Sequence, residues 1–328
     1  MKVSCSKAAL VNGVQAVYKA VSPRAAIPAL SGILVETCAQ GLRLVAYDLD
    51  LGIETFIPVT IEREGAMVMP ARYLSDITRR LPHSEVVIEY REDVRAADIL
   101  SDRSNFTVKT MPAEEFPALP EIPMVSTWSV PEPGLKTMIR RTAPAVATED
   151  NRAFYTGIYT TFQKDTLTMV STDTFRLAHR SMPVSLPIEN QVGVIIPGKT
   201  LLEVERNLSA EGDREVSVAV TDRHAMFRVG STTYITRLLE GQFPNYRQVF
   251  PQNIPARLMC DRMQLLNSID RVSLMCKDEL SAVRMVYTGD EGMASGFLTI
   301  TANTPEVGEA RDDIPVSMQG HADVTVAL

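Results

Sequence analysis

The sequence predicts an α+β protein made of three copies of one unit, each of which reads helix, strands, helix, strands. A chain of 328 residues exceeds the size at which one hydrophobic core keeps growing, so more than one domain is expected. Three landmarks then recur along the chain at a spacing near 127 residues. Such self-similarity indicates a repeated architecture.

The strand at 41–48 is the first landmark. Its sequence, Gly-Leu-Arg-Leu-Val-Ala-Tyr-Asp, alternates apolar and polar residues and ends in an acid. This pattern is typical of a half-buried strand that runs into a turn. It returns 125 residues later at 166–173 and about 130 residues after that at 297–303. Each copy is therefore expected to contain an equivalent strand.

Junctions between a strand and a helix form the second landmark. Residues 68–70 (Val-Met-Pro) precede a helical pattern over 71–81, and residues 195–197 (Ile-Ile-Pro) precede one over 198–208. Proline suits the first helical turn, because its missing N–H costs nothing there. Each unit also begins with a helical pattern, at 7–20, 135–147 and 263–276. The first of these places its apolar residues on one face: Leu10, Val11, Val14, Val17 and Val21.

The third landmark is a Phe-Pro pair. Residues 115–117 (Glu-Phe-Pro) and 242–244 (Gln-Phe-Pro) lie 127 residues apart, each after an alternating strand, at 106–109 and 234–238. We therefore expect domains at 1–125, 126–252 and 253–328. The third domain is expected to be incomplete, because one more period from Ile196 reaches Val326 and about 45 residues of a full unit would follow.

Composition narrows the class of protein. The chain is 45% hydrophobic and 22% charged, the balance of a soluble globular protein. No run reaches the roughly 18 apolar residues of a membrane span, and the N-terminus is too polar for a signal peptide. The four cysteines are dispersed, without zinc-ligand spacing. We expect a cytoplasmic, reduced protein with no metal, no cofactor and no membrane association.

Charge is unevenly distributed along the chain. The net charge of −7 argues against a protein that grips nucleic acid over its whole surface. Residues 1–35 nevertheless contain Lys2, Lys7, Lys19 and Arg24 and no acid. A local basic surface is therefore compatible with the acidic total.

Enzyme-like patterns are weak in this sequence. Residues 193–200 (Gly-Val-Ile-Ile-Pro-Gly-Lys-Thr) fit the P-loop expression, but the supposed loop is strand-like and the residues before it are polar. The matching stretch of the first copy, 66–73, carries no phosphate chemistry. No Gly-x-Ser-x-Gly occurs, and Asp48 and Asp173 stand at strand ends, where turn chemistry explains them better than catalysis. We expect no enzyme, with a P-loop ATPase as the rival from another class.

Three segments carry a family resemblance. Residues 172–177 (Thr-Asp-Thr-Phe-Arg-Leu) with Ser-Met-Pro at 181–183, residues 241–247 (Gly-Gln-Phe-Pro-Asn-Tyr-Arg) and residues 68–72 (Val-Met-Pro-Ala-Arg) resemble motifs of the bacterial DNA sliding clamp, the beta subunit of DNA polymerase III. The resemblance runs along essentially the whole chain. It implies the DNA clamp fold, in which the two helices of each domain lie on an inner face and antiparallel sheets on the outer face.

The resemblance also implies a function without catalysis. In this family two subunits meet head to tail in a ring, which encircles double-stranded DNA without sequence specificity and acts as a processivity factor in replication. The partners it implies are the DNA polymerase III alpha subunit, the clamp loader, other proteins with a clamp-binding motif, and a second copy of the complete chain. A nearer rival is a regulatory clamp paralogue that binds partners without encircling DNA.

The resemblance places three sets of residues. Cations on or beside the inner helices would contact DNA: Lys7, Lys19, Arg24, Arg72, Arg79, Arg80, Lys136, Arg140, Arg141, Lys199 and Arg206. A shallow apolar groove on the second domain would bind partner peptides: Tyr155, Thr172, Thr174, Phe175, Arg176, Leu177, Pro244 and Val249. Ring closure would involve Arg103, Phe106 and Val108 on one side, and Leu274, Met275, Glu306 and Glu309, with Asp312 and Asp313, on the other.

The sequence departs from the family pattern in the groove. Thr174 stands where the family commonly has glycine, and Gln248 stands where a basic residue is frequent. In the family the last C-terminal residues close one side of the groove, and residues up to Leu328 are not expected to supply them.

Overall fold

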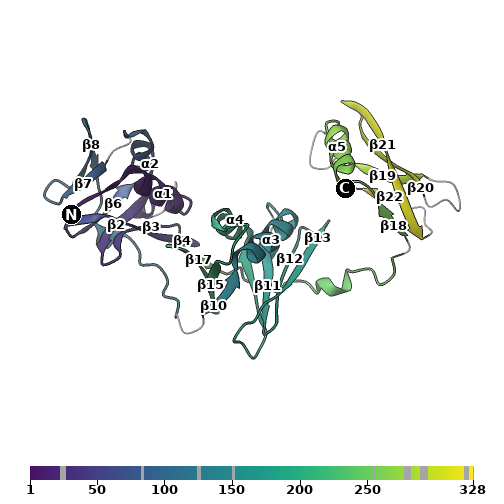
Figure 1. Ribbon diagram of the computed structural model, residues 1–328, viewed down its shortest axis with the longest axis horizontal. Coiled ribbons are helices and arrows are strands. Elements are labelled where there is room, and N and C mark those ends of the chain that lie inside the picture. Colours follow the sequence, from purple (N-terminus) through teal and green to yellow (C-terminus); the bar gives the residue numbers. More distant parts are fainter. Residues whose placement is uncertain are drawn as a thin grey trace. The chain divides into compact units, whose positions relative to one another are not determined.

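The computed structural model describes residues 1–22, 27–82, 85–123, 127–149, 152–254, 256–276, 282–288, 295–320 and 325–327. The chain forms two compact units, Met1–Phe243 and Pro244–Leu328. The first unit holds helices α1 (Lys7–Tyr18), α2 (Ala71–Arg80), α3 (Glu132–Thr142) and α4 (Gly198–Asn207), and the second holds α5 (Arg262–Ser273). Figure 1 shows α1 beside α2, and α3 beside α4.

A five-stranded antiparallel sheet belongs to the N-terminal part of the first unit. Its order is β5-β1-β7-β8-β9. The strands are β1 (Lys2–Ser6), β5 (Thr60–Arg63), β7 (Glu85–Arg91), β8 (Ala96–Ser101) and β9 (Ser104–Lys109). Strand β9 thus lies at an edge of this sheet.

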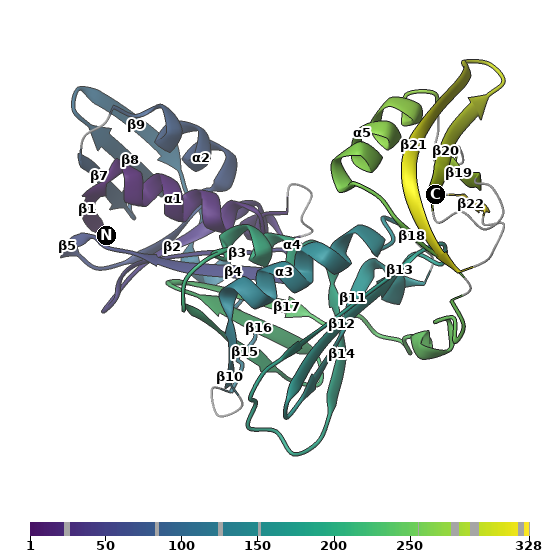
Figure 2. The same ribbon diagram turned by 45° about the vertical axis from the view of Figure 1, so that its right-hand side comes forward.

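An eight-stranded antiparallel sheet joins the two repeats of the first unit, in the order β10-β15-β16-β17-β4-β3-β2-β6. The N-terminal repeat supplies β2 (Gly32–Cys38), β3 (Gly41–Tyr47), β4 (Leu51–Ile57) and β6 (Ala66–Pro70). The next repeat supplies β10 (Thr127–Pro131), β15 (Glu215–Val220), β16 (His224–Val229) and β17 (Thr232–Arg237). Strands β4 and β17 form the junction, and Figure 2 shows the sheet passing from one repeat into the other.

A four-stranded antiparallel sheet completes the first unit. Its order is β13-β12-β11-β14, from β11 (Gly157–Gln163), β12 (Thr166–Thr172), β13 (Leu177–Pro183) and β14 (Val192–Pro197). Among the described residues of the unit, short 3₁₀ turns connect the elements at Pro28–Ser31, Ala113–Glu115, Ala143–Ala145 and Ala153–Thr156.

The described residues of the second unit form an antiparallel sheet and the helix α5. The sheet order is β18-β21-β20-β19-β22, from β18 (Ala256–Met259), β19 (Arg284–Thr288), β20 (Ser295–Thr304), β21 (Gly308–Gly320) and β22 (Thr325–Ala327). Val272 of α5 packs with Leu298, Ile300 and Ile314 in a core of its own. A 3₁₀ turn, Tyr246–Gln248, precedes β18.

The predicted repeated strands are confirmed, and so are the helices predicted at 7–20 and 263–276, which are α1 and α5. The helix predicted at 135–147 is α3, which begins earlier, at Glu132, and ends at Thr142 before the 3₁₀ turn Ala143–Ala145. Predicted helices at 71–81 and 198–208 are α2 and α4, and predicted strands at 41–48, 166–173 and 297–303 are β3, β12 and β20. Pro70 and Pro197 differ slightly from the prediction, because each ends a strand and caps the helix instead of lying inside its first turn.

The two faces of the eight-stranded sheet are covered differently. At the junction Ile53 pairs with Tyr234, and both belong to the main core together with residues of α1 and α4. The next pair along the strands is Gly52 and Ile235, and the Ile235 side chain lies on the opposite face, since successive side chains alternate across a sheet. Leu119, in the segment that links the repeats, covers that opposite face.

Candidate functional site: helix cations, partner groove and sheet edges

The second helix of each repeat in the first unit carries cations at equivalent places. Arg72 and Lys199 lie 127 residues apart, in the first turns of α2 and α4, and Arg79 and Arg206 lie 127 residues apart in the last turns. All four side chains are exposed. Seven residues separate the cations of one helix, about two turns, so they lie on the same side of it.

Acids on these helices also repeat. Asp76 contacts Arg80 at 3.1 Å and Arg79 at 3.9 Å, and Glu203 pairs with Arg206. These are exposed pairs within one helix, which contribute little to stability. Arg79 also donates to the carbonyl and the hydroxyl of Ser75, whereas Arg72 and Lys199 have no ion pair to a described residue.

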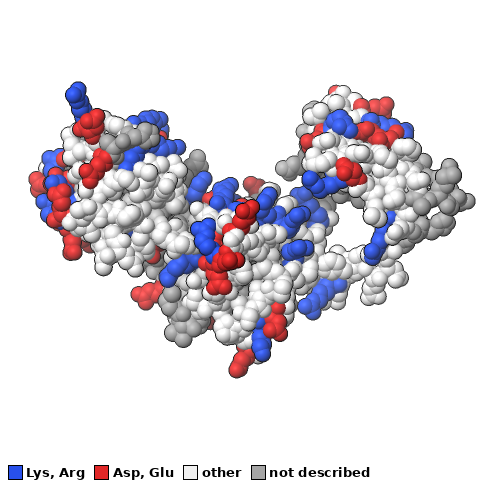
Figure 3. All heavy atoms as spheres, in the orientation of Figure 1, with Lys and Arg blue, Asp and Glu red and all other residues white. Residues whose placement is uncertain are grey.

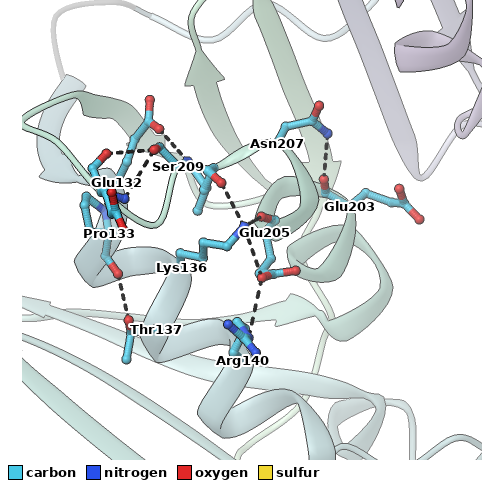
Figure 4. A network of polar contacts seen from close by, with 11 residues as sticks. Glu132, Pro133, Lys136, Thr137, Arg140, Glu203, Glu205, Asn207 and Ser209 are labelled. Atoms are coloured by element: carbon cyan, nitrogen blue, oxygen red, sulfur yellow. Dashed lines mark hydrogen bonds and ion pairs between the residues drawn. The ribbon is translucent and has the colours of Figure 1, made fainter.

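Two lysines of the first helices bind main-chain carbonyls. The Lys7 ammonium donates to the carbonyl of Leu81, at the end of α2. The Lys136 ammonium donates to the carbonyls of Leu208 (2.8 Å) and Glu205 (3.0 Å), at the end of α4, and lies 3.4 Å from the Glu205 carboxylate. Figure 4 shows Lys136 pointing from α3 to these groups. Each lysine satisfies carbonyls that a helix end leaves open.

A buried carboxylate supports the same helix pair. Glu132 opens α3, is almost fully buried, and accepts a hydrogen bond from the Ser209 N–H at 2.7 Å. The Arg214 guanidinium lies 3.5 Å from it. Because an unpaired buried polar group is costly, these contacts satisfy the Glu132 carboxylate and hold the segment after α4 against α3.

The other predicted DNA-contacting cations lie as follows. Lys19, Arg80, Arg140 and Arg141 are exposed, and Arg140 is 3.9 Å from Glu205. Arg24 lies outside the described residues. Figure 3 shows Lys and Arg side chains gathered around α3 and α4, with Asp and Glu among them.

A compact turn forms the centre of the predicted groove. Asp173 Oδ1 accepts from the N–H groups of Phe175 and Arg176, both at 3.0 Å, and its Oδ2 accepts from Arg176 Nε at 2.8 Å. Thr172 Oγ1 donates to the Arg176 carbonyl at 2.8 Å and accepts from the Thr174 N–H at 3.1 Å. Burial raises the pKa of Asp173, but the hydrogen bonds from Arg176 and Phe175 outweigh it and the pKa is lowered.

This turn presents an exposed aromatic ring. Phe175 is 96% exposed, Thr172 is buried, and Leu177 is half-buried and pairs with Thr172 across β12 and β13. Asp48 makes the same turn in the first repeat, since its Oδ1 accepts from the N–H groups of Asp50 and Leu51. The interpretation of both acids as turn residues is thereby confirmed.

Tyr155 lies at the same end of the four-stranded sheet. It belongs to the 3₁₀ turn that enters β11, and Tyr159 of β11 pairs with Val170 of β12, so the start of β11 is next to the end of β12. The Arg152 guanidinium carbon lies 4.5 Å from the centre of the Tyr155 ring, a cation–π contact. The Phe154 ring centre is also 4.5 Å away. Sequence reasoning missed Arg152 and Phe154, because only their position before β11 marks them.

Pro244 and Val249 of the predicted groove belong to the second unit. Pro244 begins that unit, and Val249 follows the 3₁₀ turn Tyr246–Gln248 and is well exposed. Tyr246 is buried and meets Phe250 edge to face, with ring centres 6.4 Å apart.

The predicted ring-closing residues of the first unit lie on or beside the edge strand β9. Phe106 is 40% exposed on this strand, and Arg103 is exposed in the turn before it. Val108 is half-buried and packs against the main core. An open strand edge is a ready template for pairing with another strand.

Their predicted counterparts lie in the second unit. Leu274 is well exposed at the end of α5, Met275 packs on the core, and Glu306 and Glu309 are exposed around the β20–β21 turn. Two further acids have partners inside the unit. Asp312 pairs with Arg271, and Asp313 contacts Arg311 and Thr299.

The P-loop pattern is part of a strand and a helix. Residues 192–197 are β14, which pairs with β11 over its whole length, and α4 begins at Gly198. A Cβ on Gly193 would lie 2.6 Å from the Tyr159 hydroxyl, and one on Gly198 would lie 2.9 Å from Val146 Cγ1. Both glycines are therefore explained by close packing. Among the described residues, no helix is long and apolar enough to cross a membrane.

Relatives with known names share this architecture. Residues 1–120 match the family of DNA polymerase III beta subunit N-terminal domains, and residues 129–245 match the family of its central domains. The beta sliding clamp of Bacillus subtilis (strain 168) is 31% identical over 322 residues, 96% of this chain and 84% of that protein. The beta sliding clamp of Staphylococcus aureus (strain N315) is 30% identical over 304 residues, 90% of this chain and 78% of that protein.

Solved structures agree with this. The DNA polymerase sliding clamp from Bacillus subtilis superposes with a TM-score of 0.90 at 30% identity, over 100% of this chain and 87% of that chain. A sliding clamp from Pseudomonas aeruginosa superposes with a TM-score of 0.88 at 30% identity, over 100% of this chain and 86% of that chain. The predicted clamp fold and family are confirmed, and the chain belongs to the beta sliding clamps of DNA polymerase III, non-catalytic DNA sliding clamps of bacterial replication.

Proposed function

We propose that two copies of this clamp close head to tail around duplex DNA, contact its phosphates through exposed helix cations, and capture peptides of replication proteins on the second repeat. The partners are the DNA polymerase III alpha subunit, the clamp loader and other proteins with a clamp-binding motif. The main support for the ring is the β4–β17 junction, where edge strands of two repeats pair within one chain.

The β9 edge repeats the β17 edge. The β8–β9 hairpin closes on the pair Ser101 and Ser104, as the β16–β17 hairpin closes on Val229 and Thr232. This correspondence makes Phe106 the equivalent of Tyr234. Tyr234 is 1% exposed at the junction with β4, while Phe106 faces an open edge. Pairing of β9 with a strand like β4 would bury Phe106 in the same way.

The counterpart of β4 in the second unit is β21. Ala46 pairs with Ile53 in the first repeat, and Ala302 pairs with Ala310 in the third. Because β3 and β20 are equivalent strands, Ala310 in β21 occupies the position that Ile53 has in β4. Tyr234 pairs with Ile53, so the ring is expected to pair Phe106 of one subunit with Ala310 of the next. This register also sets Arg103 beside acids of β21, which favours head-to-tail contact between unlike surfaces.

Cysteine cross-linking tests this register. Phe106→Cys with Ala310→Cys, in a chain whose exposed Cys260 is serine, is expected to form disulfide-linked copies under mild oxidation. The control, Phe106→Cys with Asp312→Cys, shifts one partner by two residues and should cross-link much less. Equal cross-linking of the two pairs would contradict the proposed register.

Phosphate contact is supported by the repeated cations Arg72, Arg79, Lys199 and Arg206, with Lys19, Arg80, Arg140 and Arg141 beside them. Exposed lysine and arginine side chains on helices attract phosphate without reading bases. Lys7 and Lys136 are left out of this proposal, since their ammonium groups bind helix carbonyls.

Peptide capture is supported by the turn at 172–177. Its hydrogen bonds fix a half-buried Leu177 beside a fully displayed Phe175, on an otherwise well-packed repeat. Apolar side chains that enter a small preformed pocket dominate the affinity of such interfaces. The family resemblance assigns Pro244 and Val249 to the same groove, and this assignment stays a prediction.

A further inference from the structure

The first repeat has its own counterpart of the groove turn. Tyr47 and Gly52 pair across β3 and β4 and flank a four-residue turn that begins with Asp48. Thr172 and Leu177 pair in the same way across β12 and β13 and flank the turn that begins with Asp173. Tyr47 therefore corresponds to Thr172, and Gly52 corresponds to Leu177.

That counterpart is already covered by the chain itself. A Cβ added to Gly52 would overlap Leu119 Cδ2, and the added atom would lie 3.4 Å from Tyr47. The Leu119 side chain thus lies directly on Gly52. It packs in one cluster with Tyr47 and Phe116, and in another with Ile235 of the next repeat.

The segment from Met111 to Ile122 follows the sheet surface on both sides of this point. Met111 exchanges two hydrogen bonds with Val68, each 2.9 Å, Phe116 is buried in the same cluster, and Ile122 packs on the second repeat. Leu119 lies between these anchors. A side chain tethered on both sides meets its site at a high effective concentration, which a free peptide does not easily match.

We propose that the linker acts as a built-in ligand: Leu119 occupies the first repeat's counterpart of the partner groove and thereby excludes partner peptides from it. This inference rests on the proposed groove of the second repeat. The first unit then offers its peptide site on the second repeat, although both of its repeats contain this paired-strand turn. The latent site would take an extended apolar segment with a leucine side chain, since that is the group seated there.

The difference between Gly52 and Leu177 supports this assignment. At Gly52 the absence of a side chain leaves room for Leu119 to reach the strand backbone, as glycine allows close approach. At the equivalent place on the second repeat, Leu177 carries a half-buried side chain of its own. One repeat is therefore built to accept a leucine from the linker, and the other to present a leucine to a ligand.

Binding of a labelled peptide tests the inference. The probe is a synthetic peptide with the sequence of residues 115–122, titrated into wild type, Leu119→Asp and the control Ala118→Asp. The charged side chain should leave the apolar site in Leu119→Asp, because burial of an unpaired carboxylate is costly. Ala118 is exposed, so the control adds the same charge without freeing the site. The expected result is at least tenfold tighter binding to Leu119→Asp than to either of the others.

Combining the change with Leu177→Ala separates the two sites. The gained binding is expected to persist in Leu119→Asp with Leu177→Ala, whereas loss of all binding in that double variant would overturn the inference. If the peptide binds wild type weakly and the single variant Leu177→Ala binds it equally well, only the second-repeat groove is contradicted. The two failures are thus distinguishable.

A second variant covers the case in which Leu119→Asp does not fold. Leu119→Ala removes the seated side chain, while Gly52 keeps the room above the strand, and should give the same gain in binding. In wild type, a peptide with a photoreactive leucine is expected to leave residues 47–52 unlabelled. Labelling of these residues in wild type, or no gain in the folded variants, would overturn the inference.

Discussion

Thr174 occupies the same left-handed turn position in the second repeat that Leu49 occupies in the first, and both residues have φ of 80°. Each follows the aspartate that closes the turn. Side chains with a Cβ are disfavoured at this φ, and a β-branched residue such as Thr174 most of all. The turn geometry is therefore imposed by the paired strands and the aspartate, against the preference of the residue itself.

Replacement of Thr174 by glycine should stabilise the protein. Relief of a left-handed conformation is worth roughly 1–2 kcal/mol, and the greater freedom of glycine in the unfolded chain removes about 0.5–1 kcal/mol of it. We expect a net gain of about 1 kcal/mol in the free energy of unfolding by urea denaturation. Thr174→Ala, which keeps the strained φ, is the matched control and should gain less. A less stable Thr174→Gly would show that the turn is not strained.

Stability should depend on the ionisation of Asp173. Its pKa is lowered, because hydrogen bonds from Arg176 and Phe175 outweigh the effect of burial. A carboxyl with a depressed folded pKa stabilises the protein above its unfolded value near 3.9 and loses that contribution as the pH falls through the folded pKa. The advantage of wild type over Asp173→Asn should therefore be full at pH 7 and shrink below about pH 4. Thermal unfolding across this range measures it, and an advantage that grows on acidification would contradict the assignment.

Lys136 should matter for stability more than for DNA. Lys136→Met keeps the apolar stem but removes the donor to the carbonyls of Leu208 and Glu205. Loss of partners for buried acceptors costs about 1–3 kcal/mol, and since these groups are partly buried we expect the lower end. Lys199→Met, on the exposed start of α4, should change the free energy of unfolding by less than about 0.5 kcal/mol. Equal effects in urea denaturation would mean that the Lys136 contacts are not stabilising.

Particular residues show what the sequence can and cannot predict. The limits of α4 follow from a local pattern, an apolar period after Pro197, and the structure confirms them within a residue. The β4–β17 pairing joins Ile53 to Tyr234, far apart in the chain, and no local signal marks it. From sequence alone Lys7 cannot be told apart from the other helix cations, because its contact with the Leu81 carbonyl depends on the packing of α1 against α2.

The groove illustrates the same limit. The Asp173 turn is predictable, because aspartate at a strand end commonly accepts from the next N–H groups. The role of Leu119 is not, since a leucine between two prolines in a connecting segment carries no periodicity. Its position on Gly52 depends on the path of the linker over a sheet that two repeats build together.

DNA affinity should fall with salt in proportion to the number of phosphate contacts. Removing one cation that neutralises a phosphate reduces the slope of log affinity against log salt by about 1. We expect this for Lys199→Ala and Arg72→Ala, measured on DNA duplexes of equal length, and no change for Lys7→Ala. The loss should be the same for unrelated sequences, because no base is read. A sequence-dependent loss would point to direct base recognition.

Peptide affinity should depend on Leu177 and Val249. A short peptide from a polymerase tail, with apolar anchors, is expected to bind the second repeat. Truncation of either residue to alanine should cost on the order of 1–2 kcal/mol, roughly tenfold in affinity, because buried apolar anchors dominate such interfaces. Phe175→Ala tests whether the displayed ring contacts the ligand. Lys7→Ala is the matched control, since Lys7 binds the end of α2 on the other repeat. A titration that gives equal affinities for wild type, Leu177→Ala and Lys7→Ala would place the peptide site elsewhere on the clamp.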